Sequence, residues 1–181
     1  AAEWPQAQIE AVDIEPQLLP VAQEYFGYRN HTRIHHTFTD GRRYLEDSEH
    51  QYDMIFGDAY STYYAVPSHM ASLEFLHMAK QKLAPDGLFI GNFIGTLADT
   101  KPSFLLSELR TFQRVFPNSQ FFATQDKHDP NLIQNIIFVG INGNEQINSC
   151  SNGMRRSPSK FFQTLCAQEI DPNDYDLSQH H

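Results

Sequence analysis

Three aspartates stand at or just after the ends of segments whose sequences are typical of buried β-strands. Asp13 falls near the end of the first segment, and Asp40 and Asp58 directly follow the second and the third. In an open parallel α/β sheet, ligands bind in the crevice outside the carboxyl ends of the strands, so we expect the three carboxylates to face one pocket. They suit the hydroxyl and amino groups of a nucleoside, together with a cationic substrate. The predicted strands are Ile9–Ile14, Ile34–Thr39 and Met54–Gly57.

Asp58 is the best candidate for acid–base catalysis among the three aspartates. It opens a loop rich in hydroxyl groups, which reads DAYSTYY. A carboxylate that such a loop partly desolvates can accept a proton from an ammonium nucleophile, or orient it. Tyr60 and Ser61 are the predicted substrate-binding residues, and Tyr60, Tyr63 and Tyr64 together fit a lid over a ligand. The alternatives are a capping or hinge role for Asp58, and tyrosines that only pack on the next helix.

Asp13 and the Asp40-Gly41 pair are the predicted nucleoside-binding residues. A carboxylate at this strand end typically accepts hydrogen bonds from ribose hydroxyls, which is the expected role of Asp13. Asp40 is expected to hold an adenine amino group, and Gly41 lets the backbone approach the ring. Two plainer interpretations stay open. Asp13 is then an acid in the first turn of a helix, a role that suits Glu15 better, and Asp40-Gly41 is only a turn.

Strands and helices alternate along the chain, which predicts a Rossmann-like, doubly wound α/β sheet. We expect it to be mostly parallel, with an antiparallel hairpin at its C-terminal edge. No GxGxxG motif occurs, so we expect an N-terminally incomplete domain that lacks its first strand and Gly-rich loop. That strand would be central, and its loss is expected to expose apolar edges. The other predicted elements are helices 16–26, 42–46, 68–83, 102–115 and 159–170, strands 88–93, 120–124 and 135–141, and a turn at 84–87.

The length and composition of the chain limit the classes of protein to which it can belong. The 181 residues suffice for one domain with a hydrophobic core, predicted over residues 1–142. Residues 143–181 are expected to form a polar linker, a short helix and a disordered tail. The net charge of −9 argues against nucleic-acid binding and fits a cationic small molecule. No apolar run is long enough for a membrane span and no signal peptide is visible, so the expected location is cytoplasmic, without a membrane partner.

The metal-binding residue types do not form a site. Cys150 and Cys166 match neither a zinc spacing nor a redox motif, which predicts free thiols. His35 and His36 are adjacent on a predicted strand and point to opposite faces, so they cannot chelate one metal together. We therefore expect neither a metal nor a prosthetic group.

Three stretches together resemble the spermidine/spermine synthase family, whose members are aminopropyltransferases on a class I methyltransferase-like Rossmann fold. The stretches read IEAVDIEPQLLPVAQEYFG, DGRRYLEDSEHQYDMIFGDAY and EFLHMAKQKLAPDGLFIGNF, and the similarity covers residues 8–95. The resemblance implies that Asp13 binds the ribose of decarboxylated S-adenosylmethionine and that Asp40 holds its adenine amino group. It also implies that Asp58 takes the proton from the attacking amine of putrescine.

The chain departs from the family pattern at two places in the matched region. The family's active-site loop carries a second Asp, followed by Pro, where this chain has Ser61, and that Asp helps to bind amines. The family's usual Gln after the fifth strand is replaced by Asn92-Phe93. These changes indicate a divergent, spermidine-synthase-like protein and leave the amine acceptor open.

Three functions are compatible with the sequence. The first is an aminopropyltransferase of polyamine biosynthesis, with decarboxylated S-adenosylmethionine as co-substrate and an amine such as putrescine as acceptor. The second is a methyltransferase that uses intact S-adenosylmethionine, which the loss of an acid at Ser61 favours. The third is a non-catalytic relative of the fold. A homodimer is an expected assembly, because an exposed strand edge invites pairing.

Overall fold

The computed structural model describes residues 5–60, 66–99, 103–144, 150 and 160–179. The chain forms two compact units, residues 1–49 and residues 50–181, which we call the N-terminal unit and the C-terminal unit. The predicted domain boundary after residue 142 stays a prediction.

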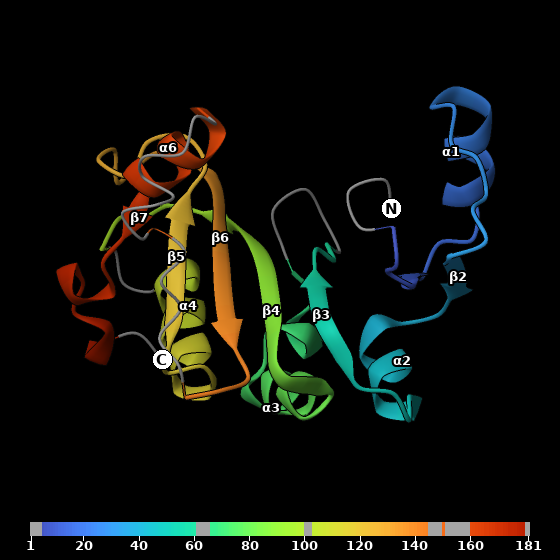
Figure 1. Ribbon diagram of the computed structural model, residues 1–181. Coiled ribbons are helices and arrows are strands. Elements are labelled where there is room, and N and C mark those ends of the chain that lie inside the picture. The colour runs from blue at the N-terminus through green and yellow to red at the C-terminus, as the bar shows by residue number, and fades with distance from the viewer. Residues whose placement is uncertain (1–4, 61–65, 100–102, 145–149, 151–159, 180–181) are drawn as a thin grey trace. The chain divides into compact units, whose positions relative to one another are not determined.

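The N-terminal unit is a β-α-β-α arrangement (Figure 1). Its two strands are parallel neighbours, with Ile9 opposite Ile34 and Asp13 opposite Phe38. The first helix leads into Gly27, whose φ of 68° is the left-handed conformation that glycine adopts after a helix. The elements are β1 (Ile9–Asp13), α1 (Leu18–Tyr25), β2 (Ile34–Phe38) and α2 (Gly41–Asp47), each close to its predicted position.

The N-terminal unit buries little of its apolar surface. Leu45 is the only buried hydrophobic residue among those described in this unit. Ile14, Tyr25 and Phe26 are more than two-thirds exposed, at 73%, 71% and 81%. Two strands and two short helices therefore leave apolar surface that this unit does not cover by itself.

The C-terminal unit is built on a five-stranded mixed sheet with the order β3-β4-β6-β5-β7. β3 and β4 are parallel, whereas the other pairings are antiparallel. The predicted edge hairpin is confirmed as the β5–β6 pair, which β7 extends. The elements are β3 (Tyr52–Gly57), α3 (Leu73–Gln81), β4 (Leu83–Gly95), α4 (Phe104–Val115), β5 (Ser119–Ala123), β6 (Gln134–Ile141), α6 (Lys160–Ala167) and β7 (Glu169–Ile170).

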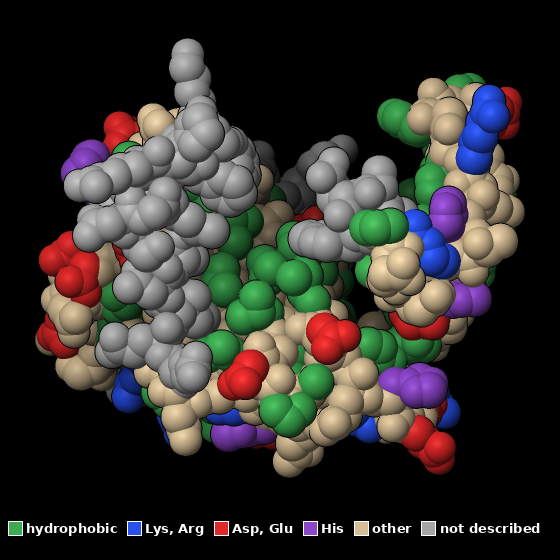
Figure 2. All heavy atoms as spheres, in the orientation of Figure 1, with side chains coloured by type: hydrophobic (Ala, Val, Ile, Leu, Met, Phe, Trp, Pro, Cys, Tyr) green, Lys and Arg blue, Asp and Glu red, His purple; other side chains and the backbone are tan. Residues whose placement is uncertain are grey.

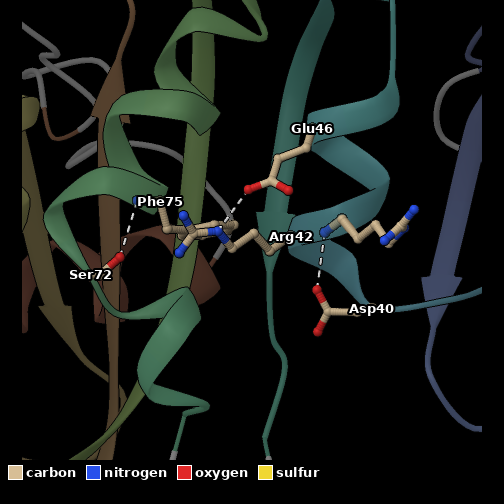
Figure 3. A network of polar contacts seen from close by, with 6 residues as sticks. Asp40, Arg42, Glu46, Ser72 and Phe75 are labelled. Atoms are coloured by element: carbon tan, nitrogen blue, oxygen red, sulfur yellow. Dashed lines mark hydrogen bonds and ion pairs between the residues drawn. The ribbon is translucent and has the colours of Figure 1, made fainter.

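The helix predicted over residues 68–83 is divided in the structure, so that prediction is wrong in its extent. A 3-10 turn covers Ser68–Met70, and α3 begins only after Ser72. Ser72 has extended backbone angles, and its hydroxyl oxygen accepts a hydrogen bond from the backbone N–H of Phe75 at 3.2 Å (Figure 3). This N-cap starts a new helix. The apolar periodicity continues across the break, so periodicity alone does not reveal it.

The turn predicted at residues 84–87 lies inside β4 as an irregularity. Opposite β3, the register moves from Tyr52 facing Leu83 to Met54 facing Leu88. Asp86 has a φ of 61°, the left-handed conformation in which Asp is one of the better tolerated residues. The strand therefore accommodates the predicted turn as a bulge, and pairing with β3 resumes after it.

α3 and α4 cover one face of the five-stranded sheet, and the core lies between (Figure 1). Burial alternates along β4 and β6, so that Phe89, Phe93 and Phe138 point to the covered face. Phe112 of α4 completes this aromatic core, with its ring centroid 5.3 Å from that of Phe138. The packed core holds the carboxyl ends of β3 and β4 in fixed register.

The opposite face of this sheet is apolar but only partly covered. Hydrophobic side chains gather over the sheet in Figure 2. Met54 and Phe56 of β3 are 41% and 62% exposed, and Phe56 pairs with Ile90 of β4. Strands that are apolar on both sides are typical of a sheet that helices cover on both faces, as in a doubly wound fold.

Cys150 and Cys166 form a disulfide, so the prediction of free thiols is wrong. Their Cα atoms are 5.4 Å apart, within the range that disulfides require. Both are buried against Phe122 of β5, with Val139 of β6 packed beside them. A structural disulfide needs proximity in the fold rather than a motif-like spacing, which is why the sequence gives no sign of it.

The segment after β7, expected to be disordered, contains two short 3-10 turns, Pro172–Asp174 and Leu177–Gln179. Asp171 starts the first of them, because its Oδ1 accepts the backbone N–H of Asn173 at 2.9 Å. The helices of this protein are short. No helix in the described part of the chain is long and apolar enough to cross a membrane.

Candidate functional site

The predicted site residues fall into two groups, one in each unit. The N-terminal unit holds the predicted nucleoside-binding residues Asp13, Asp40 and Gly41, and the C-terminal unit holds Asp58 and Tyr60. The expectation that the three carboxylates share one pocket spans both units and stays a prediction. The loop residues Ser61, Tyr63 and Tyr64 lie outside the described residues.

Asp13 closes β1 with an exposed carboxylate. Its Oδ1 accepts the backbone N–H of Glu15 at 2.8 Å, and Glu15 Oε1 accepts that of Gln17 at 2.9 Å. Both acids thus accept backbone N–H groups in the turn into α1. Asp13 Oδ2 accepts no hydrogen bond from a described residue, so this oxygen is available to a ligand hydroxyl.

Asp40 is the N-cap of α2, and Gly41 is the first residue of that helix. The Oδ1 atom of Asp40 accepts the backbone N–H of Arg43 at 3.0 Å (Figure 3). The plainer interpretation of Asp40 as a local structural residue therefore has support. Because the backbone N–H of Thr39 donates to the Asp13 carbonyl at 2.9 Å, Asp13 and Asp40 lie at the same edge of the β1–β2 pair.

Asp58, directly after β3, and Asn92, within β4, form a hydrogen-bonded pair. Gly57 lies opposite Gly91 in the parallel register, so the residues that follow them are neighbours. Asn92 Nδ2 donates to Asp58 Oδ1 at 2.8 Å. The second oxygen of Asp58 accepts no hydrogen bond from the rest of the described chain, and the side chain is exposed. One oxygen is therefore held by the neighbouring strand.

Tyr60 connects the start of the loop after β3 to β4. Its hydroxyl donates to the backbone carbonyl of Asn92 at 2.7 Å. Burial, and to a smaller extent the negative charge of Asp58, raise the pKa of Tyr60 to about 12. The phenol therefore keeps its proton and remains a donor at neutral pH. Its predicted role in substrate binding stays a prediction.

Asn92 also lines a small cavity beside the Asp58 loop. The cavity has a volume of about 20 Å³, and its other walls include Gly57, Ala59, Phe75 and Phe89. The Oδ1 atom of Asn92 is buried and has no hydrogen-bond partner among the described residues. The amide thus donates a hydrogen bond to Asp58 through Nδ2, whereas its Oδ1 accepts none from a described residue.

Chemically, this arrangement suits proton transfer and the binding of a cation. An exposed carboxylate with one oxygen fixed by a neutral amide can accept a proton or a hydrogen bond from an amine at the other oxygen. No group of three His, Cys, Asp or Glu residues that could hold a metal ion occurs within the described ranges. The described groups at this strand end are the Asp58 carboxylate and the Asn92 amide.

A larger cavity of the C-terminal unit, about 300 Å³, is lined by residues other than those around Asp58. Its polar walls include His77, Lys80 and Asn142, and no carboxylate lines it. Lys80 Nζ donates to the carbonyl of Val115 at 2.7 Å, and Asn142 Nδ2 donates to the carbonyl of Leu83 at 2.9 Å. Lys80 and Asn142 thus hold backbone carbonyls of the fold. We therefore assign the candidate chemistry to Asp58, although the cavity there is smaller.

Sequence reasoning did not identify Asn92 as a site residue. It noted Asn92 only as a departure from a family pattern. The available signal was positional: Asn92 follows Gly91 on the strand beside β3, just as Asp58 follows Gly57. Finding the contact requires the register between these two strands, which sequence patterns do not specify.

No protein-family model matches the chain. Curated relatives match part of it. Over 115 residues it is 32% identical to a probable polyamine aminopropyl transferase from Bifidobacterium longum, which covers 64% of this chain and 25% of that protein. Over 124 residues it is 29% identical to an eEF1A lysine and N-terminal methyltransferase homolog from Drosophila melanogaster, which covers 64% and 18%. The chain thus spans a quarter or less of the length of these relatives.

Solved structures match nearly the whole chain. A probable spermidine synthase from Corynebacterium glutamicum superposes with a TM-score of 0.74 at 22% identity, covering 96% of this chain and 61% of that one. A spermidine synthase in complex with the transition-state analogue AdoDATO gives 0.70 at 16% identity, covering 96% and 61%. Human methyltransferase-like protein 13 in complex with SAH gives 0.58 at 21% identity, covering 92% and 71%. The predicted class I methyltransferase-type α/β fold is confirmed.

Proposed function

We propose that this chain, which is spermidine-synthase-like over part of its length, is the nucleoside-binding and catalytic portion of an aminopropyltransferase. The reaction moves an aminopropyl group from decarboxylated S-adenosylmethionine to an amine such as putrescine, a step of polyamine biosynthesis. The neutral amine attacks the methylene next to the sulfonium. A C–N bond forms as the C–S bond breaks, and the electron pair of that bond passes to sulfur, so that methylthioadenosine leaves.

The observation that carries this proposal is the Asp58 carboxylate at the carboxyl end of β3. Asn92 holds one of its oxygens at 2.8 Å and the other accepts no hydrogen bond from a described residue. The attacking nitrogen must lose a proton, and Asp58 is the base that takes it. The remaining contribution of the protein is to orient the two substrates.

Asp13, Asp40 and Gly41 bind the nucleoside of the co-substrate in this proposal. Asp13 Oδ2 accepts a ribose hydroxyl, and Asp40 holds the adenine amino group beside Gly41. The placement of Asp13 and Asp40 at one edge of the β1–β2 pair supports this assignment. Tyr60 and Ser61 contact the amine substrate, whose second, protonated amino group suits a chain with a net charge of −9.

A methyltransferase that uses intact S-adenosylmethionine is the second candidate. Similarity to a lysine and N-terminal methyltransferase, and to a methyltransferase structure that contains SAH, favours it. Ser61, in place of a second acid, removes a group that would bind an amine. The two candidates differ in whether the site accepts the carboxylate of the methionine part of the co-substrate.

A thermal-shift comparison of the two co-substrates tests these candidates on the full-length protein. A ligand that binds only the native state raises the melting temperature with its concentration and affinity. The proposal predicts a larger shift with decarboxylated S-adenosylmethionine than with S-adenosylmethionine. A larger shift with the intact form would support the methyltransferase, and no shift with either would support a non-catalytic relative.

The cellular location and the assembly are further proposals. A cytoplasmic location agrees with small-molecule polyamine chemistry, whereas the Cys150–Cys166 disulfide favours an oxidising compartment. Thiol labelling in intact cells distinguishes the two locations. In a reducing cytoplasm we expect free thiols that become labelled, and in an oxidising compartment we expect a disulfide that does not. A homodimer is the proposed assembly, and light scattering on the full-length protein tests it.

A further inference from the structure

Asn92 contacts the Asp58 carboxylate through the pairing of β3 and β4. Its Nδ2 donates to Asp58 Oδ1 at 2.8 Å, and the register that sets Gly57 opposite Gly91 brings the two residues together. No other described side chain donates a hydrogen bond to Asp58. The contact therefore belongs to the rigid part of the fold, since both partners directly follow paired residues of the sheet.

The main chain of Asn92 is held as well. The Tyr60 hydroxyl, which the raised pKa keeps protonated, donates to the Asn92 carbonyl at 2.7 Å. The loop after β3 is thus fastened to β4 at two points, by the Asp58 carboxylate and by Tyr60. Together these contacts restrict the direction in which the Asp58 carboxylate points.

The other end of the Asn92 amide lies beside apolar side chains. Its Oδ1 is buried without a hydrogen-bond partner among the described residues, in a wall shared with Phe75 and Phe89. Most buried polar side-chain atoms are paired, and an unpaired acceptor lowers stability. An apolar side chain of similar size would suit this wall better. The N–H that the amide presents to Asp58 is the contact that accounts for an asparagine here.

We propose that Asn92 is a positioning residue for Asp58, an inference that rests on the proposed role of Asp58 as the base. By fixing Oδ1, the amide directs Oδ2 at the amine. Oδ2 then takes the proton of the attacking nitrogen while the C–N bond forms, the C–S bond breaks and the electron pair passes to sulfur. In this proposal Asn92 acts through Asp58 and not on a substrate directly.

Steady-state kinetics of Asn92→Leu in the full-length protein test this proposal. Leucine has a similar size but donates no hydrogen bond, so kcat is expected to fall by about 10- to 100-fold. The KM for the co-substrate is expected to stay within about twofold, because the proposed nucleoside-binding residues are left unchanged. The melting temperature is expected to stay the same or to rise, because an unpaired buried acceptor is removed.

Two further variants separate positioning from a general structural effect. Asn135→Leu makes the same exchange on β6 at a residue that pairs with Ile94, away from Asp58, and should leave kcat unchanged. Asn92→Gln keeps an amide N–H and should recover part of the lost kcat. Wild-type kcat in Asn92→Leu, or equal losses in all three variants, would overturn the role of Asn92. A wild-type protein that transfers no aminopropyl group would instead overturn the proposed function, and this inference with it.

Discussion

Asp58 is an exposed carboxylate whose two oxygens have different surroundings. Oδ1 is engaged by Asn92, and Oδ2 accepts no hydrogen bond from a described residue. The asymmetry matters because a base must present a defined lone pair to the proton it removes. The proposed proton transfer therefore depends on one carboxylate and on the amide that orients it.

Replacing Asp58 by Asn removes the base while preserving the hydrogen bond from Asn92. We expect kcat to fall by about 100- to 10,000-fold, the usual contribution of a general base. The affinity for the nucleoside co-substrate should be unchanged, as calorimetry can measure. Asp53→Asn is the matched control, since Asp53 is an exposed carboxylate on the same strand. Full activity in Asp58→Asn would rule out Asp58 as the base.

Glu108 of α4 predicts a pH dependence of stability. It is 8% exposed, and its Oε2 atom has no hydrogen-bond partner in the described part of the chain. Burial raises the pKa of Glu108 from 4.5 to about 7. At a pH between 4.5 and about 7, Glu108 is ionised in the unfolded chain but keeps its proton in the folded protein. The free energy of unfolding therefore falls as the pH rises through this window.

Glu108→Gln should remove this loss of stability. At pH 8 the variant is expected to be more stable than the wild type by roughly 2–3 kcal/mol, and at pH 4 the two should be about equal. Urea denaturation at the two pH values measures the difference. An equal effect of the substitution at both pH values would show that Glu108 does not titrate in this way.

At the level of elements, the disulfide joins α6 to Cys150, and both cysteines pack against the sheet. Cys166 of α6 and Cys150 are buried against Phe122 of β5, and β7 then pairs with the same strand. The C-terminal segment thus becomes part of the C-terminal unit. Its stability depends on a covalent link as well as on packing, because most of the chain between the two cysteines is polar.

Removing the disulfide should destabilise the C-terminal unit. The bond closes a loop with a sequence separation of 16 residues, for which the chain-entropy model gives about 3 kcal/mol. We expect the paired exchange Cys150→Ser and Cys166→Ser to lower the melting temperature in calorimetry. A reducing agent should lower that of the wild type by a similar amount and leave the variant unaffected. A wild type insensitive to the reductant would contradict a stabilising role.

Across the whole molecule, the positions of most strands and helices were predictable because their patterns are local. The strand Tyr52–Gly57 and the β5–β6 hairpin follow from apolar runs and the turn residues between them. The break at Ser72 and the disulfide were not predictable, since the first depends on a single cap and the second on tertiary proximity.

The candidate site was predictable in part. Aspartates at strand ends can be read from the sequence, because the ends of apolar runs are visible there. The pairing of Asp58 with Asn92 depends on register, and the capping by Asp40 depends on where α2 begins. The expectation that the three carboxylates share one pocket involves residues of both units, and it stays a prediction.

The central claim is aminopropyl transfer, and a product assay tests it most directly. The full-length protein is incubated with putrescine and with either decarboxylated or intact S-adenosylmethionine, and the products are identified by mass spectrometry. We expect equal amounts of methylthioadenosine and aminopropylated amine, formed only with the decarboxylated co-substrate and lost in Asp58→Asn. Methyl transfer from the intact co-substrate, or no product while the decarboxylated form binds, would contradict it.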